Sequence, residues 1–375
     1  MTGPILGGTL AAIALVTAIM WMVPVIDRDT IWFGVRVPGD RADDPAIVAA
    51  LRRYRRHVAG SGALAAVTAV ALGPWMPFGF WLALTGGVLA AALIVAYGYA
   101  HRTVRFAKVR GDWYAGKRAG VAVDTTLRTE PEPVPWWAAL PSLAIIGAVA
   151  VIGVVSYPSL PDELVVAVNY RPDGLEYVTV ETTVLSAFGP VMIQAAVTAL
   201  LLLVLWVTMR ARAELDPARP RRSGLRHRRF LRIWSYSLFA VMLAQNLVLA
   251  TVAMLIWTGS LRDAGPVMIA LVVLPVVAVS GLVWAAALRS GQGGWRLRSG
   301  GGERDEPTDV VPPDDDRHWR VGGLVYVNRE DPSVLVQKRG GFGWTVNFGH
   351  RSVLLGVAAV GVIAVATVVT ALSVG

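Results

Sequence analysis

Side chains that commonly do chemistry are few in this chain of 375 residues, and they are scattered. Cysteine is absent, which excludes disulfides, thiolate nucleophiles and cysteine-ligated metals. The histidines lie in basic loops or at the edges of apolar runs, and no two are close in sequence: His57, His101, His227, His318 and His350. A metal site or a general base needs converging partners. The sequence therefore predicts neither an enzyme nor a bound cofactor or metal.

Two short motifs could bind an ion or a phosphate. The run Asp314-Asp315-Asp316 could bind a cation, although a solvated linker face is the favoured interpretation. The glycines at 340–343 lack the Lys-Ser/Thr helix start of a phosphate-binding loop and favour a tight β-turn. A Gly-x-Ser-x-Gly nucleophile elbow is also absent.

Three groups of residues are candidates for binding rather than catalysis. An acidic group in the loop 158–184 could face a ligand: Asp162, Glu163, Asp173, Glu176 and Glu181. A second group in the segment 319–348 could bind a partner: Trp319, Tyr326, Asn328, Lys338, Arg339, Trp344 and Asn347. A third group consists of amides inside apolar runs: Gln194, Gln245 and Asn246. Such amides either hydrogen-bond helices together or line a polar cavity.

Long apolar runs must position these residues. The chain is 55% hydrophobic and 16% charged, whereas a soluble domain is about 25% charged. Eight runs approach the roughly 20 residues that cross a bilayer: Pro4–Ile26, Val58–Gly73, Phe78–Tyr99, Trp136–Tyr157, Leu185–Met209, Ile233–Trp257, Gly265–Leu288 and Ser352–Val374. The second is short for a span. The predicted fold class is an all-α polytopic membrane protein with about eight transmembrane helices.

The basic residues predict an orientation. Of 35 Lys and Arg residues, 33 lie in four gaps between runs, at 27–57, 101–135, 210–232 and 289–351. Cytoplasmic loops of membrane proteins are enriched in Lys and Arg. We therefore expect a protein of the cell membrane with these four gaps on the cytoplasmic side and both termini on the outer side. The net charge of +9 is then explained by the lipid bilayer as partner, and nucleic-acid binding is not expected.

The gaps predict small elements of their own. Residues 39–57 have the pattern of an amphipathic helix that lies along the inner leaflet. Leu164–Tyr170 and Leu175–Val180 flank a Pro-Asp-Gly turn and predict an extracytoplasmic β-hairpin. In the cytoplasm we expect a small three-stranded β-meander: Leu324–Asn328, Val334–Lys338 and Trp344–Phe348.

These elements predict a division of the chain into six parts. Residues 1–135 carry three spans and the amphipathic helix, 136–209 a helix–hairpin–helix unit, and 210–288 two further spans. A Gly-, Pro- and Asp-rich tether at 289–318 is expected to be disordered. The β-meander at 319–348 and a final span at 349–375 complete the chain.

Three segments resemble known families. Tyr157–Glu163, with Asn169 and Asp173-Gly174, resembles the domain-of-unknown-function family DUF1648. Phe33–Pro38 resembles related bacterial membrane proteins that include SdpI-type immunity proteins. Gly323–Pro332, with Lys338-Arg339 and Gly343–Phe348, resembles the family DUF5808, and this motif is the most specific of the three.

The resemblance implies a role, and the composition allows alternatives. SdpI-type proteins protect a cell from a membrane-active peptide and can hold a regulator at the membrane. We therefore expect immunity towards, or sensing of, a cationic peptide or envelope stress, with a regulatory protein bound inside. A small-molecule transporter is the alternative, although the spans lack a central ionisable residue. A membrane enzyme is the weakest hypothesis.

Overall fold

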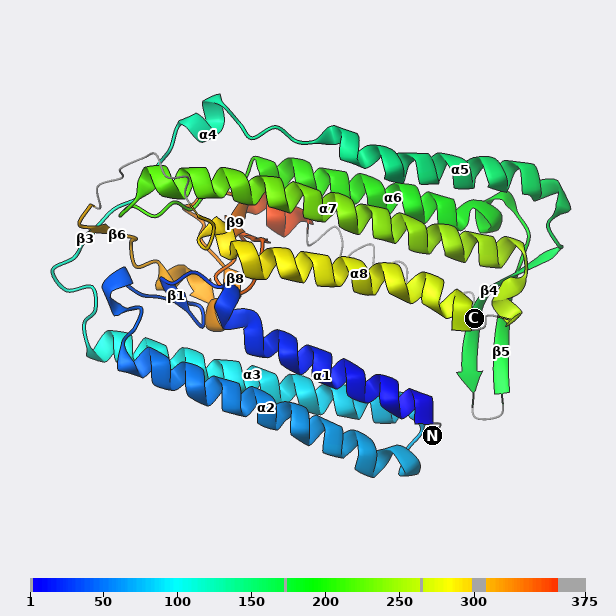
Figure 1. Cartoon of the computed structure of the whole chain (residues 1–375), viewed down its shortest axis with the longest axis horizontal. Coiled ribbons are helices and arrows are strands. Elements are labelled where there is room, and N and C mark those ends of the chain that lie inside the picture. The colour runs from blue at the N-terminus through cyan, green and yellow to red at the C-terminus, as the bar shows by residue number, and fades with distance from the viewer. Residues whose placement is uncertain (1–2, 172–173, 264–265, 299–307, 357–375) are drawn as a thin grey trace. The chain divides into compact units, whose positions relative to one another are not determined.

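The computed structural model describes residues 3–171, 174–263, 266–298 and 308–356, and most of them are helical (Figure 1). In this described part of the chain seven helices are long: α1 (Gly3–Ile26), α2 (Pro45–Leu72), α3 (Phe78–Arg110), α5 (Leu140–Ser156), α6 (Val184–Met209), α7 (Pro220–Trp257) and α8 (Pro266–Ser290). A single turn, α4 (Thr126–Thr129), precedes α5.

Among the described residues, six helices are long and apolar enough to cross a membrane: α1, α3, α5, α6, α7 and α8. The sequence predicted eight spans, and two of these are not confirmed. The second predicted span is part of α2, whose first half carries four arginines between positions 52 and 56. The eighth, Ser352–Val374, falls mostly outside the described residues, because only 352–356 of it are described, as helix.

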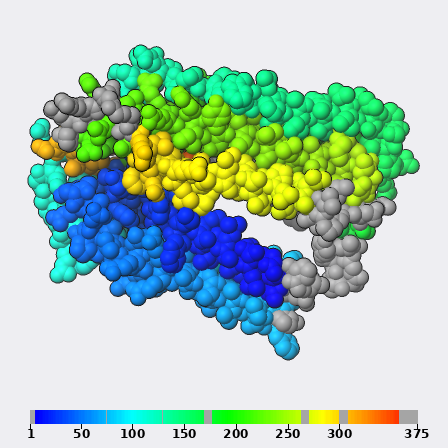
Figure 2. Space-filling view, in the orientation of Figure 1, coloured from blue at the N-terminus to red at the C-terminus, as the bar shows by residue number. Residues whose placement is uncertain are grey.

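The chain forms two compact units, which are described separately. Unit 1 comprises residues 1–128, 211–227 and 290–375. In this unit α2 packs against both α1 and α3, and Figure 2 shows α1 and α2 as adjacent blue layers. Unit 2 comprises residues 129–210 and 228–289, so α7 begins in unit 1 and continues into unit 2.

The amphipathic segment of unit 1 is the first half of α2, not a separate helix. Asp44 caps the helix by accepting a 2.9 Å hydrogen bond from the amide of Ala46, and Pro45 is the first helical residue. The apolar face is buried in a core shared with α3 and the segment 31–37, and includes Ile47, Tyr54 and Val58. Protein therefore covers this apolar face, and the expected position of the helix along the inner leaflet stays a prediction.

The loops of unit 1 form short β-pairs. Hairpins join β1 (Ile31–Trp32) to β2 (Val35–Arg36), β7 (Trp319–Arg320) to β8 (Val325–Tyr326), and β9 (Leu335–Gln337) to β10 (Trp344–Val346). β3 (Arg118–Ala119) pairs in parallel with β6 (Val310–Val311). The turn predicted at the glycines 340–343 therefore joins two strands. The predicted three-stranded meander is wrong, since β8 meets the β10 side only through one parallel bridge, Tyr326 to Asn347.

Unit 2 carries the predicted outer hairpin. β4 (Glu163–Arg171) and β5 (Gly174–Glu181) are antiparallel, with an irregularity in register between Val165 and Ala167. The base of the hairpin packs on α5, α6 and the end of α7 through a core that includes Leu164, Ala187 and Trp257. The indole nitrogen of Trp257 donates a 2.9 Å hydrogen bond to the carbonyl of Ala187. The hairpin itself is confirmed, its turn residues 172–173 lie outside the described residues, and its extracytoplasmic position stays a prediction.

Candidate functional site

Five stretches of unit 1 meet at one end of its helices, and we call them the loop assembly. They are residues 27–44, 111–125, 211–227, 290–298 and 308–350. Backbone hydrogen bonds join stretches that are distant in sequence, such as the 3.0 Å bond from the amide of Thr308 to the carbonyl of Ala218. The assembly therefore brings together charges that no local motif contains.

Arg36 is a central cation of this assembly. Its guanidinium pairs with Glu214 at 2.5 Å and with Asp315 at 2.6 Å, and only 6% of its side chain is exposed. Arg339 is more deeply buried, at 1% exposure, and pairs with both Asp315 and Asp316. Two guanidinium groups thus share one carboxylate, and each has a second partner.

Further pairs extend this set into a network. Lys108, at the end of α3, pairs with Asp314 at 2.7 Å and with Asp316 at 2.6 Å. Arg28, just after α1, lies 3.7 Å from Glu214. The charge network consists of four cations and four carboxylates: Arg28, Arg36, Lys108, Arg339, Glu214, Asp314, Asp315 and Asp316. The interpretation of 314–316 as solvated carboxylates is wrong for Asp315 and Asp316, which are partly buried and pair with cations from distant parts of the chain. Asp314 is 42% exposed, although it too pairs with Lys108.

Burial and pairing act in opposite directions on these groups. Burial favours the neutral acid at Asp315, but the nearby Arg36 and Arg339 outweigh it, so the pKa of Asp315 is well below its ordinary value. Glu214 is similar, because Arg36 and Arg28 overcome its burial and lower its pKa. The pKa of Arg36 is raised, since Glu214 and Asp315 outweigh desolvation. Asp315, Glu214 and Arg36 therefore stay charged at neutral pH.

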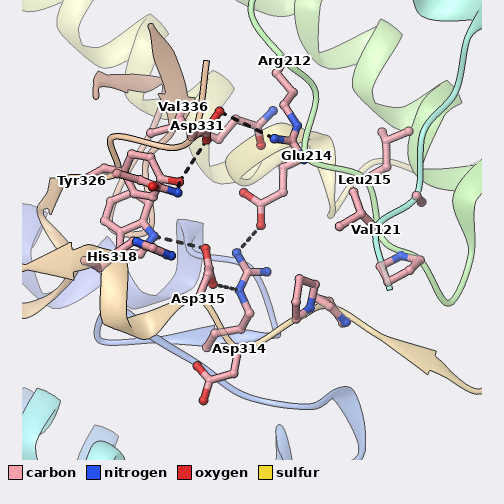
Figure 3. Close-up of a pocket in the computed structure, with 18 of the residues that line it drawn as sticks. Val121, Arg212, Glu214, Leu215, Asp314, Asp315, His318, Tyr326, Asp331 and Val336 are labelled. Carbon is pink, nitrogen blue, oxygen red and sulfur yellow. Dashed lines mark hydrogen bonds and ion pairs between the residues drawn. The ribbon is translucent and has the colours of Figure 1, made fainter. Parts of the chain in front are cut away.

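A cavity of about 450 Å³ lies beside the network, with Glu214 and Asp315 in its wall (Figure 3). Its lining includes carboxylates, guanidinium groups and prolines, and Val121 and Leu215 form an apolar side. Arg212 reaches the cavity from the segment after α6, and it lies 3.9 Å from Asp331. The cavity thus presents both signs of charge.

Aromatic rings form another side of the cavity (Figure 3). The rings of Trp319 and Tyr326 lie 5.0 Å apart, and His318 lies 6.2 Å from Tyr326. The phenol of Tyr326 donates a 3.0 Å hydrogen bond to Asp331 and accepts one from the side-chain amide of Asn328 at 3.2 Å. These bonds fix the polar edge of the ring at the cavity.

Asn347 holds the backbone next to this aromatic side. It is fully buried. Its side-chain oxygen accepts hydrogen bonds from the amides of Asn328 and Gly349 at 3.0 and 2.9 Å. Its side-chain nitrogen donates to the carbonyls of Asn328, Asp331 and Ser333 at 2.8, 3.1 and 3.2 Å. One side chain thus fixes the turn that presents Asp331 to the cavity.

Two glycines let the assembly close. Gly34 and Gly323 have φ of +76° and +87°, and their backbones touch, because a Cβ built on Gly323 would lie 2.5 Å from the Cα of Gly34. The guanidinium of Arg339 donates a 2.7 Å hydrogen bond to the carbonyl of Gly34 at the same contact. A side chain at either glycine would separate the segments that carry Arg36 and Trp319.

One buried acid stands outside the network. Asp27 is 3% exposed, and its carboxylate accepts a 2.7 Å hydrogen bond from the amide of Gly341, in the β9–β10 turn. Burial raises the pKa of Asp27 to about 8, with the Gly341 bond acting in the opposite direction. Asp27 is therefore largely protonated at neutral pH, and it ties the end of α1 to this turn.

The residues predicted for partner binding mostly lie inside the loop assembly. Trp319, Tyr326, Arg339 and Asn347 are buried. Asn328 and Trp344 are partly buried, and Lys338 is exposed. Of these residues, only Trp319, Tyr326 and Asn328 line the cavity.

The predicted outer acids lie on the hairpin of unit 2. Glu163 and Glu181 face each other across the strands, and both are exposed, as is Asp162. Glu176 is partly buried opposite Asn169, whereas Asp173 lies outside the described residues. The hairpin register thus brings Glu163 and Glu181 together at its base.

The predicted amides join α6 to α7 in unit 2. The side-chain nitrogen of Gln194 donates to the carbonyl of Asn246 at 3.0 Å. The side-chain nitrogen of Asn246 donates to the hydroxyl of Thr198 at 2.9 Å. Neither amide atom of Gln245 has a hydrogen-bond partner among the described residues. For Gln194 and Asn246 this arrangement favours the helix-joining interpretation over a polar cavity.

Histidines and carboxylates do not assemble a metal centre here. Within residues 3–171, 174–263, 266–298 and 308–356, no group of three or more His, Asp or Glu residues is arranged to hold a metal ion. The acidic run 314–316, which could have bound a cation, instead pairs with the cations of the charge network.

The six apolar helices are consistent with a multi-pass membrane protein, in which unit 1 carries a charged cavity at the ends of its helices. Residues 329–354 match the model of a family described as a family of unknown function (DUF5808). This match confirms the C-terminal resemblance and includes Asp331, Arg339 and Asn347. Comparison with curated proteins and with solved structures gives no match. The resemblance to DUF1648 and to SdpI-type proteins stays a prediction.

Several residues of the charge network could not be predicted from the sequence. Arg28, Lys108 and Glu214 look like ordinary charges that follow apolar runs. Their partners lie far away in sequence, as with Lys108 and Asp316, which are 208 residues apart. Arg36, Arg339 and Asp314–Asp316 lie in segments that the sequence motifs single out, but nothing in those motifs pairs them with one another.

Proposed function

We propose that the protein is a membrane-embedded sensor whose unit 1 cavity binds a small solute carrying both a positive and a negative group. The observation that carries this proposal is the cavity of about 450 Å³ bounded by both signs of charge. Ligand pockets commonly measure about 300–1,000 Å³ and contain a few placed polar groups. Amino acids and short peptides are the class of solute that fits.

The exposed charges in the wall favour a solute with two charges. The side chains of Asp314 and Arg212 are 42% and 54% exposed, and Glu214 is 30% exposed. An ammonium group can pair with a carboxylate of the wall while the solute's own carboxylate pairs with Arg212. A singly charged solute would leave one sign of the wall unmatched, which lowers its relative affinity.

The route from binding to signal is the charge network, which shares Arg36, Glu214 and Asp315 with the cavity wall. A bound solute would compete for the ion pairs that Arg36 makes with Glu214 and Asp315. This competition would change the stability of the loop assembly. We further propose that the assembly faces the cytoplasm, because its basic residues follow the rule for inner loops. A regulatory protein would then bind exposed residues next to the cavity, such as Lys338.

Binding to the purified full-length protein tests this proposal. A panel of free amino acids and dipeptides is compared with simple amines and simple carboxylates by calorimetry and thermal unfolding. We expect saturable binding of a doubly charged solute only. Ala213→Phe fills the cavity and should abolish it, whereas Ala211→Phe, two residues away and outside the lining, should not. Equal binding to both variants contradicts the proposal, and uptake of the solute into proteoliposomes would support the alternative, a transporter.

A second candidate function is peptide sensing at the hairpin of unit 2. Glu163 and Glu181 are like charges directly opposite each other, an arrangement that weakens a β-pair until a cation neutralises it. A cationic peptide would supply that cation, in keeping with a role in immunity or envelope stress. The hairpin lies outside the cell in the proposed orientation.

Peptide tolerance of intact cells tests this second function. Cells that produce the protein are exposed to cationic membrane-active peptides, with the double variant Glu163→Gln and Glu181→Gln compared with Glu330→Gln on unit 1. We expect reduced tolerance only for the double variant. If every variant and a deletion strain show the same sensitivity, the hairpin has no such role.

A further inference from the structure

A groove of about 920 Å³ runs between α2 and α3 of unit 1, and its two ends differ in chemistry. One end is cationic and contains Arg53, Arg56 and His57. The other end is apolar and is lined by residues of both helices: Gly60, Leu64, Val88, Ala91, Ala92 and Val95. The hydroxyl-bearing Ser61 lies between them, and its hydroxyl donates to the carbonyl of His57 at 2.8 Å.

The cationic end is positioned by an aromatic ring. Arg53 lies over the ring of Tyr99, 5.3 Å from its centre, and donates a hydrogen bond to its hydroxyl. His57 stacks on the same ring at 6.1 Å with 23° between the planes. In the described part of the chain, neither Arg53 nor Arg56 pairs with a carboxylate. Their positive charge is therefore available to an anion from outside the protein.

The apolar end continues along the helices from these charges. Leu64 is seven residues beyond His57 on α2, which corresponds to a rise of about 10 Å along the helix. Leu64 and Val95 are 53% and 68% exposed although they are large and apolar. α3 is one of the helices long and apolar enough to cross a membrane, and this composition favours a lipid environment for the apolar end.

We propose that this groove binds one anionic phospholipid, with its phosphate at Arg53 and Arg56 and an acyl chain along Leu64 and Val95. A phosphate accepts hydrogen bonds from guanidinium groups, and methylene groups suit the apolar end. A free phosphate would leave that apolar end uncovered by its ligand. The proposal is independent of the solute cavity, which lies in the loop assembly.

The neighbouring arginines provide an internal comparison. All four arginines line a second hollow beside Trp21, where Arg55 lies 5.7 Å from the indole ring centre, but only Arg53 and Arg56 also line the groove between α2 and α3. A diffuse attraction between α2 and anionic lipid would use all four arginines alike. A built site uses Arg56 and not Arg52.

Native mass spectrometry of the full-length protein in detergent tests the site. Phosphatidylglycerol is titrated against phosphatidylcholine with the same acyl chains, and glycerol 3-phosphate serves as a headgroup without chains. We expect one phosphatidylglycerol to be retained with higher affinity than phosphatidylcholine, and no retention of glycerol 3-phosphate. Removing Arg53 and Arg56 as the double variant R53Q/R56Q should weaken binding by about 5-fold for each arginine, and R52Q should leave it unchanged.

A second pair of variants tests the apolar end without removing a charge. A Cβ at Gly60 meets open space, as does one at Gly86, which lies on α3 outside the groove lining. Gly60→Leu should fill the groove and weaken phosphatidylglycerol binding, whereas Gly86→Leu should not. Thermal unfolding of each variant shows that the fold is kept.

Four results would overturn the proposal. The first is equal binding of phosphatidylcholine and phosphatidylglycerol to the native protein. The second is a loss of binding in R52Q as large as in the double variant, which would indicate diffuse attraction. The last two are unchanged binding in Gly60→Leu and full displacement by glycerol 3-phosphate, since either would indicate that the headgroup binds without the groove.

Discussion

Units 1 and 2 bury polar groups in opposite ways. The loop assembly of unit 1 buries full charges, such as Arg36 and Arg339, and gives each at least one carboxylate partner. The helices of unit 2 bury neutral amides, and the side-chain oxygens of Gln194 and Asn246 have no hydrogen-bond partner in the described structure. A buried charge without a partner costs several kcal/mol, whereas a partly satisfied amide costs far less. Ion pairs therefore stabilise the loop assembly of unit 1, whereas packed helices joined by neutral amides stabilise the spans of unit 2.

Removing one buried cation should produce the largest loss of stability. Arg339→Met removes the most deeply buried cation of the network and leaves Asp315 with Arg36 and Asp316 with Lys108. Breaking a buried pair costs about 3–5 kcal/mol when the remaining charge has no partner, so we expect about 3 kcal/mol, the lower end of that range. Arg339→Lys should recover only part of this, because one ammonium cannot replace two guanidinium contacts. Chemical unfolding in detergent measures both. A loss below about 1 kcal/mol, the value of an exposed pair, would show that the network is solvated.

The contact between two backbones should give the next largest effect. Gly323→Ala places a Cβ against Gly34 and also strains a residue with φ of +87°, so we expect a loss of about 2 kcal/mol or more. Gly341→Ala is the matched control, since Gly341 has φ of +80° but open space around it, and it should cost only the strain, about 1 kcal/mol. Equal losses in thermal unfolding would mean that the close approach contributes nothing.

The pH dependence should separate Asp27 from the charge network. The pKa of Asp27 is raised from 3.8 to about 8 in the folded protein. Between these two pH values the folded protein therefore keeps a proton on Asp27 that the unfolded chain has lost. Its contribution to stability is full below pH 3.8 and falls by about 1.4 kcal/mol per pH unit up to about pH 8. Asp315 has the opposite sign, since its lowered pKa gives stability that is lost only as the pH falls below 3.8.

Unfolding free energies between pH 5 and pH 8 measure this difference. Asp27→Asn keeps a neutral side chain, so its stability should fall less steeply with rising pH than that of the native protein. Asp316→Asn, within the network, should leave the slope in this range unchanged, because the pKa of Asp316 is lowered. A native protein with no fall in stability over this range would show that Asp27 is ionised in the folded state.

The two units also differ in how far the sequence predicts them. In unit 2 the elements are local: the hairpin around 171–174 and the apolar helices follow from alternation and from run length, and both are confirmed. In unit 1 the site depends on distant contacts, such as Arg28 with Gln337, which are 309 residues apart. Periodicity cannot report such pairs, so a paired acidic run at 314–316 resembles a solvated linker in the sequence.

Substitutions of the buried amides of unit 2 should have the smallest effects on stability. They test whether neutral polar groups contribute less there than the buried charges do in unit 1. Asn246 makes hydrogen bonds to Thr198 and to the carbonyl of Met242, whereas its neighbour Gln245 has no partner for either amide atom in the described structure. Asn246→Leu should therefore destabilise the protein by about 0.6 kcal/mol per hydrogen bond. Gln245→Leu should be neutral or slightly stabilising, because it removes unpaired polar atoms. If Gln245→Leu instead destabilises the protein or abolishes solute uptake into proteoliposomes, Gln245 faces water, and the spans of unit 2 contain a polar path.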